Sequence, residues 1–214
     1  MERLRFEDLP ADPSLADPLP ASPFTILARW LDEARAARAT PNPDAIALAT
    51  AGDDGRPSLR MVLCRGFDAA DGSIVWYTNR RSRKGRELAV QPWASAMFFW
   101  DAVQRQARLE GPVALATDAE SDAYFASRPR NAQISAWASD QSEPIASRQA
   151  LLEKLRDTEA RFAGTDPVPR PPHWGGYRLR AEHVELWVGS AGRAHDRVRW
   201  ERSASGWTST RLQP

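Results

Sequence analysis

Short apolar runs separated by tight-turn sequences occupy residues 45–116, and this pattern constrains the fold more than any other feature of the chain. Gly52-Asp53-Asp54-Gly55 and Asp71-Gly72 are typical of the turns that connect antiparallel strands. Gly111-Pro112 predicts a bend within the last run, because proline cannot continue the hydrogen bonding of a central strand. The predicted strands cover residues 45–50, 58–65, 74–78, 93–100 and 104–116.

Helical patterns surround these strands. Ser22-Pro23 is typical of a helix start, and the apolar spacing that follows predicts a helix to about residue 38. Thr117 and Glu120 form a capping-box sequence, and Ser82 can cap a short helix. The remaining helices are expected near 82–90, 117–127, 131–139 and 147–162, and the closing strands near 175–187, 194–201 and 206–212. The sequence therefore predicts a mainly β protein with α-helices, built as a barrel with peripheral helices.

The domain organisation follows from length and proline placement. A chain of 214 residues fits one domain with an appended arm. Residues 1–22 carry prolines at positions 10, 13, 18 and 20, which predict a flexible arm without regular structure. Residues 23–214 are expected to form the single domain.

Composition excludes several function classes. A net charge of +1 argues against nucleic-acid binding by bulk charge. Three scattered histidines and the single cysteine, Cys64, offer no metal-ligand spacing and no intrachain disulfide. No apolar stretch is long enough to span a bilayer, and the N-terminus has no apolar signal region. We therefore expect a cytoplasmic protein with no metal, no nucleic-acid partner and no membrane partner.

Five cationic side chains lie within residues 80–86, where a predicted strand gives way to a helix. Backbone N–H groups at a helix start favour an anion, and Arg83 and Lys84 can neutralise a phosphate. Taken alone, the segment is more typical of a solvated basic loop, since runs of charge are usually exposed.

A second candidate segment is Ser127-Arg128-Pro129-Arg130, which follows Tyr124 and precedes another predicted helix. Two guanidinium groups and a phenol beside a helix start suit a phosphate monoester. An ordinary surface loop explains the same residues about as well.

The third candidate segment is the loop expected between two strands within residues 185–197. A lone histidine is more often structural than catalytic. Here, however, Arg193 and Arg197 stand two residues to either side of His195, so on a strand the three would share one face. Such a group can orient anions and protons.

In this order and spacing, the three segments resemble the pyridoxamine 5′-phosphate oxidase family. The resemblance runs from about residue 24 to Pro214, and its most specific part is Trp-x-Gly-x-x-x-Arg-x-His-Asp-Arg at 187–197. Ser127-Arg128-Pro129-Arg130, followed by Gln133-Ile134 and Gln141-Ser142, is also specific. The resemblance implies an FMN-binding split β-barrel that works as a homodimer, with the FMN sites at the dimer interface.

The resemblance also implies roles for individual residues. Arg193 and His195 would be catalytic and hold the substrate ring against the flavin. The residues expected to bind FMN are Arg60, Met61, Val62, Leu63, Tyr77, Thr78, Arg83, Lys84, Gln106, Gln141, Ser142, Trp187 and Arg197. Those expected to bind substrate are Arg65, Tyr124, Arg128, Ala132, Arg193 and His195.

The reaction implied is oxidation of pyridoxamine 5′-phosphate or pyridoxine 5′-phosphate to pyridoxal 5′-phosphate, with O₂ as acceptor and H₂O₂ as product. Three positions depart from the family pattern. This chain has Arg65 where the family has a lysine, Ala132 where it has a serine that contacts substrate phosphate, and Asn42 where it has an acidic residue. These departures leave an alternative open, in which the chain oxidises another planar ring, as the phenazine-pathway flavin oxidases do.

Overall fold

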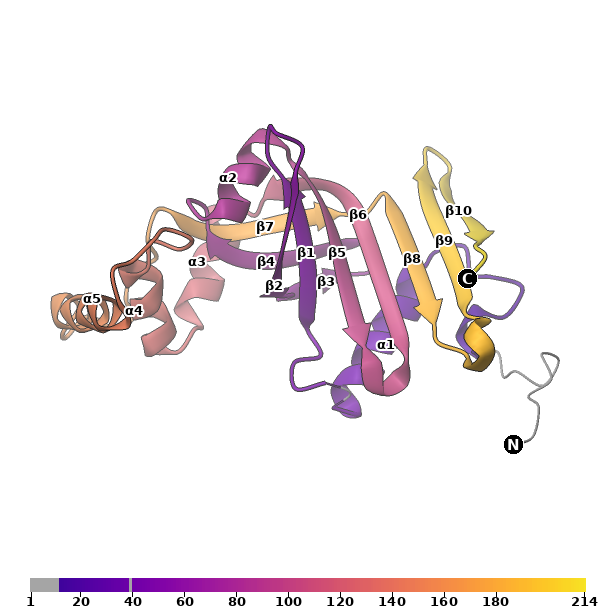
Figure 1. The fold of residues 1–214 in the computed structure, drawn as a ribbon, viewed down its shortest axis with the longest axis horizontal. Coiled ribbons are helices and arrows are strands. Elements are labelled where there is room, and N and C mark those ends of the chain that lie inside the picture. The colour runs from indigo at the N-terminus through magenta and orange to yellow at the C-terminus, as the bar shows by residue number, and fades with distance from the viewer. Residues whose placement is uncertain (1–11, 39) are drawn as a thin grey trace.

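The computed structural model describes residues 12–38 and 40–214, and its strands and helices follow one another as shown in Figure 1. The strands are β1 (Ala45–Ala51), β2 (Pro57–Leu63), β3 (Gly66–Asp68), β4 (Ser73–Asn79), β5 (Trp93–Trp100), β6 (Arg105–Leu115), β7 (Trp174–Arg180), β8 (His183–Val188), β9 (Asp196–Ser203) and β10 (Gly206–Arg211). The α-helices are α1 (Phe24–Ala36), α2 (Arg83–Val90), α3 (Asp118–Ala126), α4 (Arg130–Ala138) and α5 (Arg148–Arg161). Short 3₁₀ turns are η2 (Pro13–Leu15), η3 (Asp101–Val103) and η4 (Ala191–Arg193).

All strand pairs are antiparallel, and β6 joins the two parts of the sheet. One path runs β10-β9-β8-β6-β5-β1-β2, and β3, β4 and β7 branch from it. Strand β6 pairs with β8 as far as Glu110 and with β7 from Val113. A Cβ at Gly111 would lie 2.1 Å from the carbonyl oxygen of Arg180, so glycine is needed where β6 changes partners. The bend predicted at Gly111-Pro112 thus falls where β6 changes partners from β8 to β7.

Alternation along the strands builds the core. In β1, Ile46, Leu48 and Thr50 point inward and their neighbours are only partly buried. Helix α1 buries its apolar stripe against the sheet, as its sequence spacing predicts. Four tryptophans are almost completely buried in the core, namely Trp30, Trp76, Trp100 and Trp200.

The arm differs from its prediction where the structure describes it. Residues 13–15 form a 3₁₀ turn, and Leu15 is only 2% exposed. Asp12 pairs with Arg105 at 2.9 Å, and the indole of Trp30 donates to Ser14 at 3.1 Å. The expectation of no regular structure is therefore wrong for residues 13–15, because proline is compatible with the start of a 3₁₀ turn. Residues 1–11 lie outside the described residues.

Other element boundaries also differ from the predicted ones. The predicted strand at 175–187 is two strands, β7 and β8, separated by Ala181 and Glu182. Strand β7 pairs with β4 and β6, whereas β8 pairs with β6 and β9. Helix α1 begins at Phe24, one residue later than expected, with Pro23 at its N-cap. The caps predicted at Ser82 and at Thr117 with Glu120 are confirmed.

Two regions carry the residues of interest, and they lie at opposite sides of the molecule. Helices α2, α3 and α4 lie beside β4 and β7 at one side, whereas β8, β9 and the turn between them lie at the other (Figure 1). Within residues 12–38 and 40–214, no helix is long and apolar enough to cross a membrane.

Candidate active site

A cavity of about 820 Å³ opens between β2, β4, the start of α2 and the α3–α4 connection. This volume lies in the usual range for a cofactor or small-ligand site. Fourteen of the residues expected from the sequence line it: Arg60, Met61, Val62, Leu63, Arg65, Tyr77, Thr78, Arg83, Lys84, Tyr124, Arg128, Ala132, Gln141 and Ser142.

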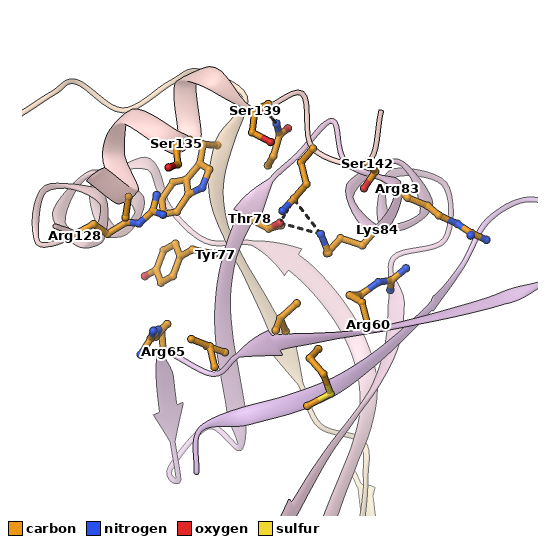
Figure 2. Close-up of a pocket in the computed structure, with 18 of the residues that line it drawn as sticks. Arg60, Arg65, Tyr77, Thr78, Arg83, Lys84, Arg128, Ser135, Ser139 and Ser142 are labelled. Carbon is orange, nitrogen blue, oxygen red and sulfur yellow. Dashed lines mark hydrogen bonds between the residues drawn. The ribbon is translucent and has the colours of Figure 1, made fainter. Parts of the chain in front are cut away.

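Lys84 is the main charge at one end of the cavity, and it is only 6% exposed. Its ammonium group donates to Thr78 Oγ1 at 3.2 Å, as Figure 2 shows. It also donates to Ser82 Oγ at 3.2 Å and to Gln141 Oε1 at 3.1 Å. All three acceptors are neutral. Burial, with Arg60 nearby, lowers the pKa of Lys84 to about 8. Among residues 12–38 and 40–214, the buried ammonium is hydrogen-bonded by neutral groups alone, and this favours the arrival of an anion.

The chain turns sharply to bring Lys84 to this position. Ser82 caps α2 through the backbone N–H of Gly85. A Cβ on Gly85 would lie 2.1 Å from the carbonyl oxygen of Arg80, so the close packing of this turn requires glycine. The basic run at 80–86 is therefore not simply a solvated loop, since Lys84 is inside and Arg83 lines the cavity.

The opposite end of the cavity is an aromatic stack that carries Arg128. Tyr77 stacks on Tyr124 with ring centroids 4.1 Å apart, and Trp174 stacks on Tyr77 at 5.7 Å. The guanidinium of Arg128 lies 4.7 Å from the Trp174 ring centre, and burial lowers its pKa. Arg128 Nη1 is buried without a hydrogen-bond partner among the described residues. Such a donor is costly to leave unpaired, which is consistent with a polar ligand at this end of the cavity.

Trp174 is a site residue that sequence reasoning missed. The signal was the glycine pair that follows it, since glycines inside a strand often mark a close approach. A Cβ on Gly176 would lie 2.8 Å from the Tyr77 ring, which confirms that β7 packs directly against that side chain. Ser135 and Ser139 also line the cavity and were not anticipated.

Figure 2 shows how the two ends face each other. Arg60, Arg83 and Lys84 lie together on one side, Arg65, Tyr77 and Arg128 lie on the other, and Thr78 lies between them. The apolar side chains of Met61, Val62 and Leu63 line the same cavity from β2. The cavity thus combines two cationic ends, one of them aromatic, with an apolar wall along β2, which suits a planar ring with an anion at either side.

Five expected site residues do not line this cavity. Gln106 pairs with Trp187 across β6 and β8, and Trp187 pairs with Arg197 across β8 and β9. Strands β8 and β9 and the turn between them, which carry Trp187, Arg193, His195 and Arg197, lie at the opposite side of the molecule from α2, α3 and α4 (Figure 1). One chain alone therefore does not bring the two groups together.

Within this second group, His195 has a defined orientation. Its ring lies 4.7 Å from Trp187, and its Nδ1 accepts a hydrogen bond from the backbone N–H of Ser190 at 3.1 Å. In the neutral ring, the proton consequently stays on Nε2. Arg193 has a φ of 63°, a left-handed conformation that is unfavourable for a residue other than glycine and is frequent at functional sites.

Comparison with known proteins decides the family. Residues 32–161 match the family described as pyridoxamine 5′-phosphate oxidase. The chain belongs to this family. Residues 174–214 match the pyridoxine 5′-phosphate oxidase C-terminal dimerisation region. A pyridoxine/pyridoxamine 5′-phosphate oxidase from Rubrobacter xylanophilus is 49% identical over 199 residues, which cover 93% of this chain and 88% of the relative.

Solved structures support the same placement. PhzG from Burkholderia lata 383, in complex with tetrahydrophenazine-1-carboxylic acid, has a TM-score of 0.87 and 36% identity over 96% of this chain and 98% of its own. A pyridoxamine 5′-phosphate oxidase-related, FMN-binding protein from Nostoc punctiforme shares the fold, with a TM-score of 0.69 and 21% identity over 89% of this chain and 96% of its own.

As a family member, the chain is an FMN-dependent oxidase with a split-barrel fold and a C-terminal dimerisation region. The donor set of the cavity fits FMN. A phosphate monoester needs charged donors, which Lys84, Arg60 and Arg83 provide at one end. The ring needs polar and apolar contacts, which Thr78 and β2 provide.

Because the pKa of Lys84 is lowered to about 8, FMN affinity should depend on pH. A phosphate monoester gains its second charge near a pKa of about 6, so binding should be tightest between that value and the pKa of Lys84. Above it, the free protein loses the ammonium charge, and affinity should fall about ten-fold or more by pH of about 10. Fluorescence titration across this range checks the result. Lys84→Met should lack the alkaline decline, and an unaltered decline in that variant would contradict the assignment to Lys84.

Proposed function

We propose that this oxidase converts pyridoxamine 5′-phosphate or pyridoxine 5′-phosphate to pyridoxal 5′-phosphate, with O₂ as acceptor and H₂O₂ as product. The observation that carries the proposal is the pair of cationic ends in one cavity, one at Lys84 and the other at Arg128. Two ends of this kind suit two phosphate groups, one on the cofactor and one on the substrate.

We assign the Lys84 end to FMN. Its phosphate would be held by Arg60, Arg83 and Lys84, where the start of α2 adds backbone N–H groups. The isoalloxazine ring would lie along Met61, Val62 and Leu63, with polar contacts from Tyr77, Thr78, Gln141 and Ser142. Bound FMN supplies the two-electron oxidation and is itself reoxidised by O₂. The protein contributes binding, orientation and exclusion of water.

We assign the Arg128 end to substrate phosphate. Arg128 offers an unpaired buried donor, Tyr124 adds a hydroxyl, and Arg65 adds a second charge at the same end. Ala132 lines this end without contributing a hydroxyl. The stack of Trp174 beneath Arg128 holds the guanidinium in one orientation, which favours binding of a fixed anion.

We assign the second group of residues to the cavity of the partner subunit. Gln106, Trp187 and Arg197 would contact the flavin, and Arg193 and His195 the substrate ring. The separation of the two groups within one chain supports this arrangement, as does the dimerisation region at 174–214. His195 would then present its Nε2 proton, and Arg193 its guanidinium, to the substrate's polar substituents.

A second candidate function is oxidation of a larger planar ring that carries a carboxylate. The complex of the similar PhzG with tetrahydrophenazine-1-carboxylic acid favours it, and so does Ala132, which removes a phosphate donor. A carboxylate would use the same Arg128 charge.

A direct comparison of substrates tests the proposal. O₂ uptake should follow addition of pyridoxamine 5′-phosphate or pyridoxine 5′-phosphate, with pyridoxal 5′-phosphate and peroxide as products. A reduced tricyclic carboxylate should be turned over much more slowly. The reverse ranking would establish the second candidate instead.

A further inference from the structure

Glu87 lies behind the cationic end of the cavity and contacts two of its arginines. It is on α2, one turn after Arg83, and its side chain is only 10% exposed. Oε1 accepts from Arg83 Nε at 2.8 Å, and Oε2 accepts from Arg60 Nη2 at 3.1 Å. Glu87 itself does not line the cavity, so it reaches a ligand there only through these partners.

Two hydroxyl groups fix the carboxylate in this position. Thr50 Oγ1 donates to Oε2 at 2.5 Å, and Ser58 Oγ donates to both oxygens at 2.8 and 2.6 Å. Although burial acts to raise it, hydrogen bonds from Ser58, Thr50, Arg83 and Arg60 lower the pKa of Glu87 to about 2. The carboxylate is therefore charged at neutral pH.

Arg83 depends on this contact for its orientation. Its side chain is 62% exposed, and within the described residues its side-chain hydrogen bond goes to Glu87 alone. An exposed arginine side chain with no partner samples many rotamers. It loses this conformational entropy when it binds a ligand. The bond from Nε to Glu87 leaves the terminal nitrogens of the guanidinium free for another acceptor.

Glu87 also sets the net charge of this end. Arg60, Arg83 and Lys84 bring three positive charges and Glu87 one negative charge, which leaves two positive charges. A phosphate monoester carries about −1.5 to −2 at neutral pH. The net charge of these four side chains therefore matches that of a phosphate dianion. Without Glu87, the three cations would repel one another in a partly buried site.

We propose that Glu87 is a positioning residue for the flavin phosphate. It holds Arg83 in the geometry that receives the phosphate and, together with Thr50 and Ser58, it fixes Arg60 beside Arg83. The proposal rests on the function proposed above, since it takes that end of the cavity as the phosphate subsite of FMN. The competing explanation is a purely structural role, in which Glu87 ties α2 to β1 and β2 through Thr50 and Ser58.

The two explanations differ in how Glu87→Gln affects FMN and riboflavin, which lacks the phosphate. Kd for both is measured by quenching of flavin fluorescence on the flavin-free, full-length protein. A positioning role predicts that FMN binding weakens about ten-fold while riboflavin binding changes less than about two-fold. A structural role predicts equal loss for both flavins. Tighter FMN binding would mean that the negative charge opposes phosphate, and it would also overturn the proposal.

Two further variants complete the design. Glu143→Gln is the matched control, because Glu143 pairs with Arg86 of the same helix at 2.6 Å on the exposed surface. It should leave both affinities unchanged. Glu87→Asp keeps the charge but shortens the reach to both arginines, so it should also lose selectivity for FMN, and full retention would contradict positioning. Should the wild-type protein fail to prefer FMN over riboflavin, the subsite assignment in the proposed function is wrong, a failure distinct from that of Glu87.

Discussion

Co-expression of Arg128→Ala and Arg193→Ala chains should restore oxidase activity to about one quarter of the wild-type value, although each variant alone should retain no more than about one tenth. Arg128 lines the cavity, whereas Arg193 lies at the far side of the same chain. If each site combines the cavity of one subunit with the β8–β9 turn of its partner, half of the sites in a mixed dimer carry no substitution. Tagging the two chains differently allows the mixed dimers to be isolated and assayed by O₂ uptake.

The control for this experiment pairs Arg128→Ala with Lys84→Ala. Both positions line the same cavity of the same chain, so every site in that mixed dimer is defective. No activity should return. Recovery of activity in this control would show that the site is not shared between subunits in the proposed way. The same conclusion would follow if isolated Arg128→Ala/Arg193→Ala mixed dimers showed no activity.

Arg128→Ala should lower kcat/KM for pyridoxine 5′-phosphate by about 10- to 150-fold, the effect of losing a charge-assisted bond worth about 1.5–3 kcal/mol. The guanidinium already lies buried on Trp174 with Nη1 unpaired, so little reorganisation is needed when phosphate binds. Steady-state O₂ uptake measures the change, and absorbance of the bound flavin shows whether FMN is retained.

Unphosphorylated pyridoxine is the matched control for that variant. It has no group for Arg128 to bind, so its kcat/KM should change little. Equal losses for both substrates would indicate that Arg128 supports the shape of the cavity rather than recognising phosphate. In that case the unpaired Nη1 would need another explanation.

The sequence predicts most strands and helices of this fold because their signals are local. The cap at Ser82 and the capping box at Thr117 each depend on a few neighbouring residues, and both are present in the structure. The bend signal at Gly111-Pro112 is also local, and it falls where β6 changes partners from β8 to β7. The division of 175–187 into β7 and β8 could not be predicted, because it depends on which distant strands each half pairs with. Burial of Leu15 also depends on partners far along the chain.

The site was predictable where a residue acts through its own side chain. Arg83, Lys84 and Arg128 lie in short basic motifs, and all three line the cavity. Glu87 gave no such signal, since its contacts with Thr50 and Ser58 span 37 and 29 residues. Nor does periodicity reveal that Arg193 and His195 are remote from the cavity, because only the folded chain shows the two groups apart.

The central claim is that this oxidase acts on a phosphorylated pyridine, and the most direct test compares pyridoxine 5′-phosphate with pyridoxine in the unmodified enzyme. The measurement is kcat/KM for each, from O₂ uptake in the presence of saturating FMN. Two cationic side chains at the substrate end predict a preference for the phosphorylated compound of about 100-fold or more. Equal values for the two compounds would contradict the claim and would show that Arg65 and Arg128 do not recognise phosphate.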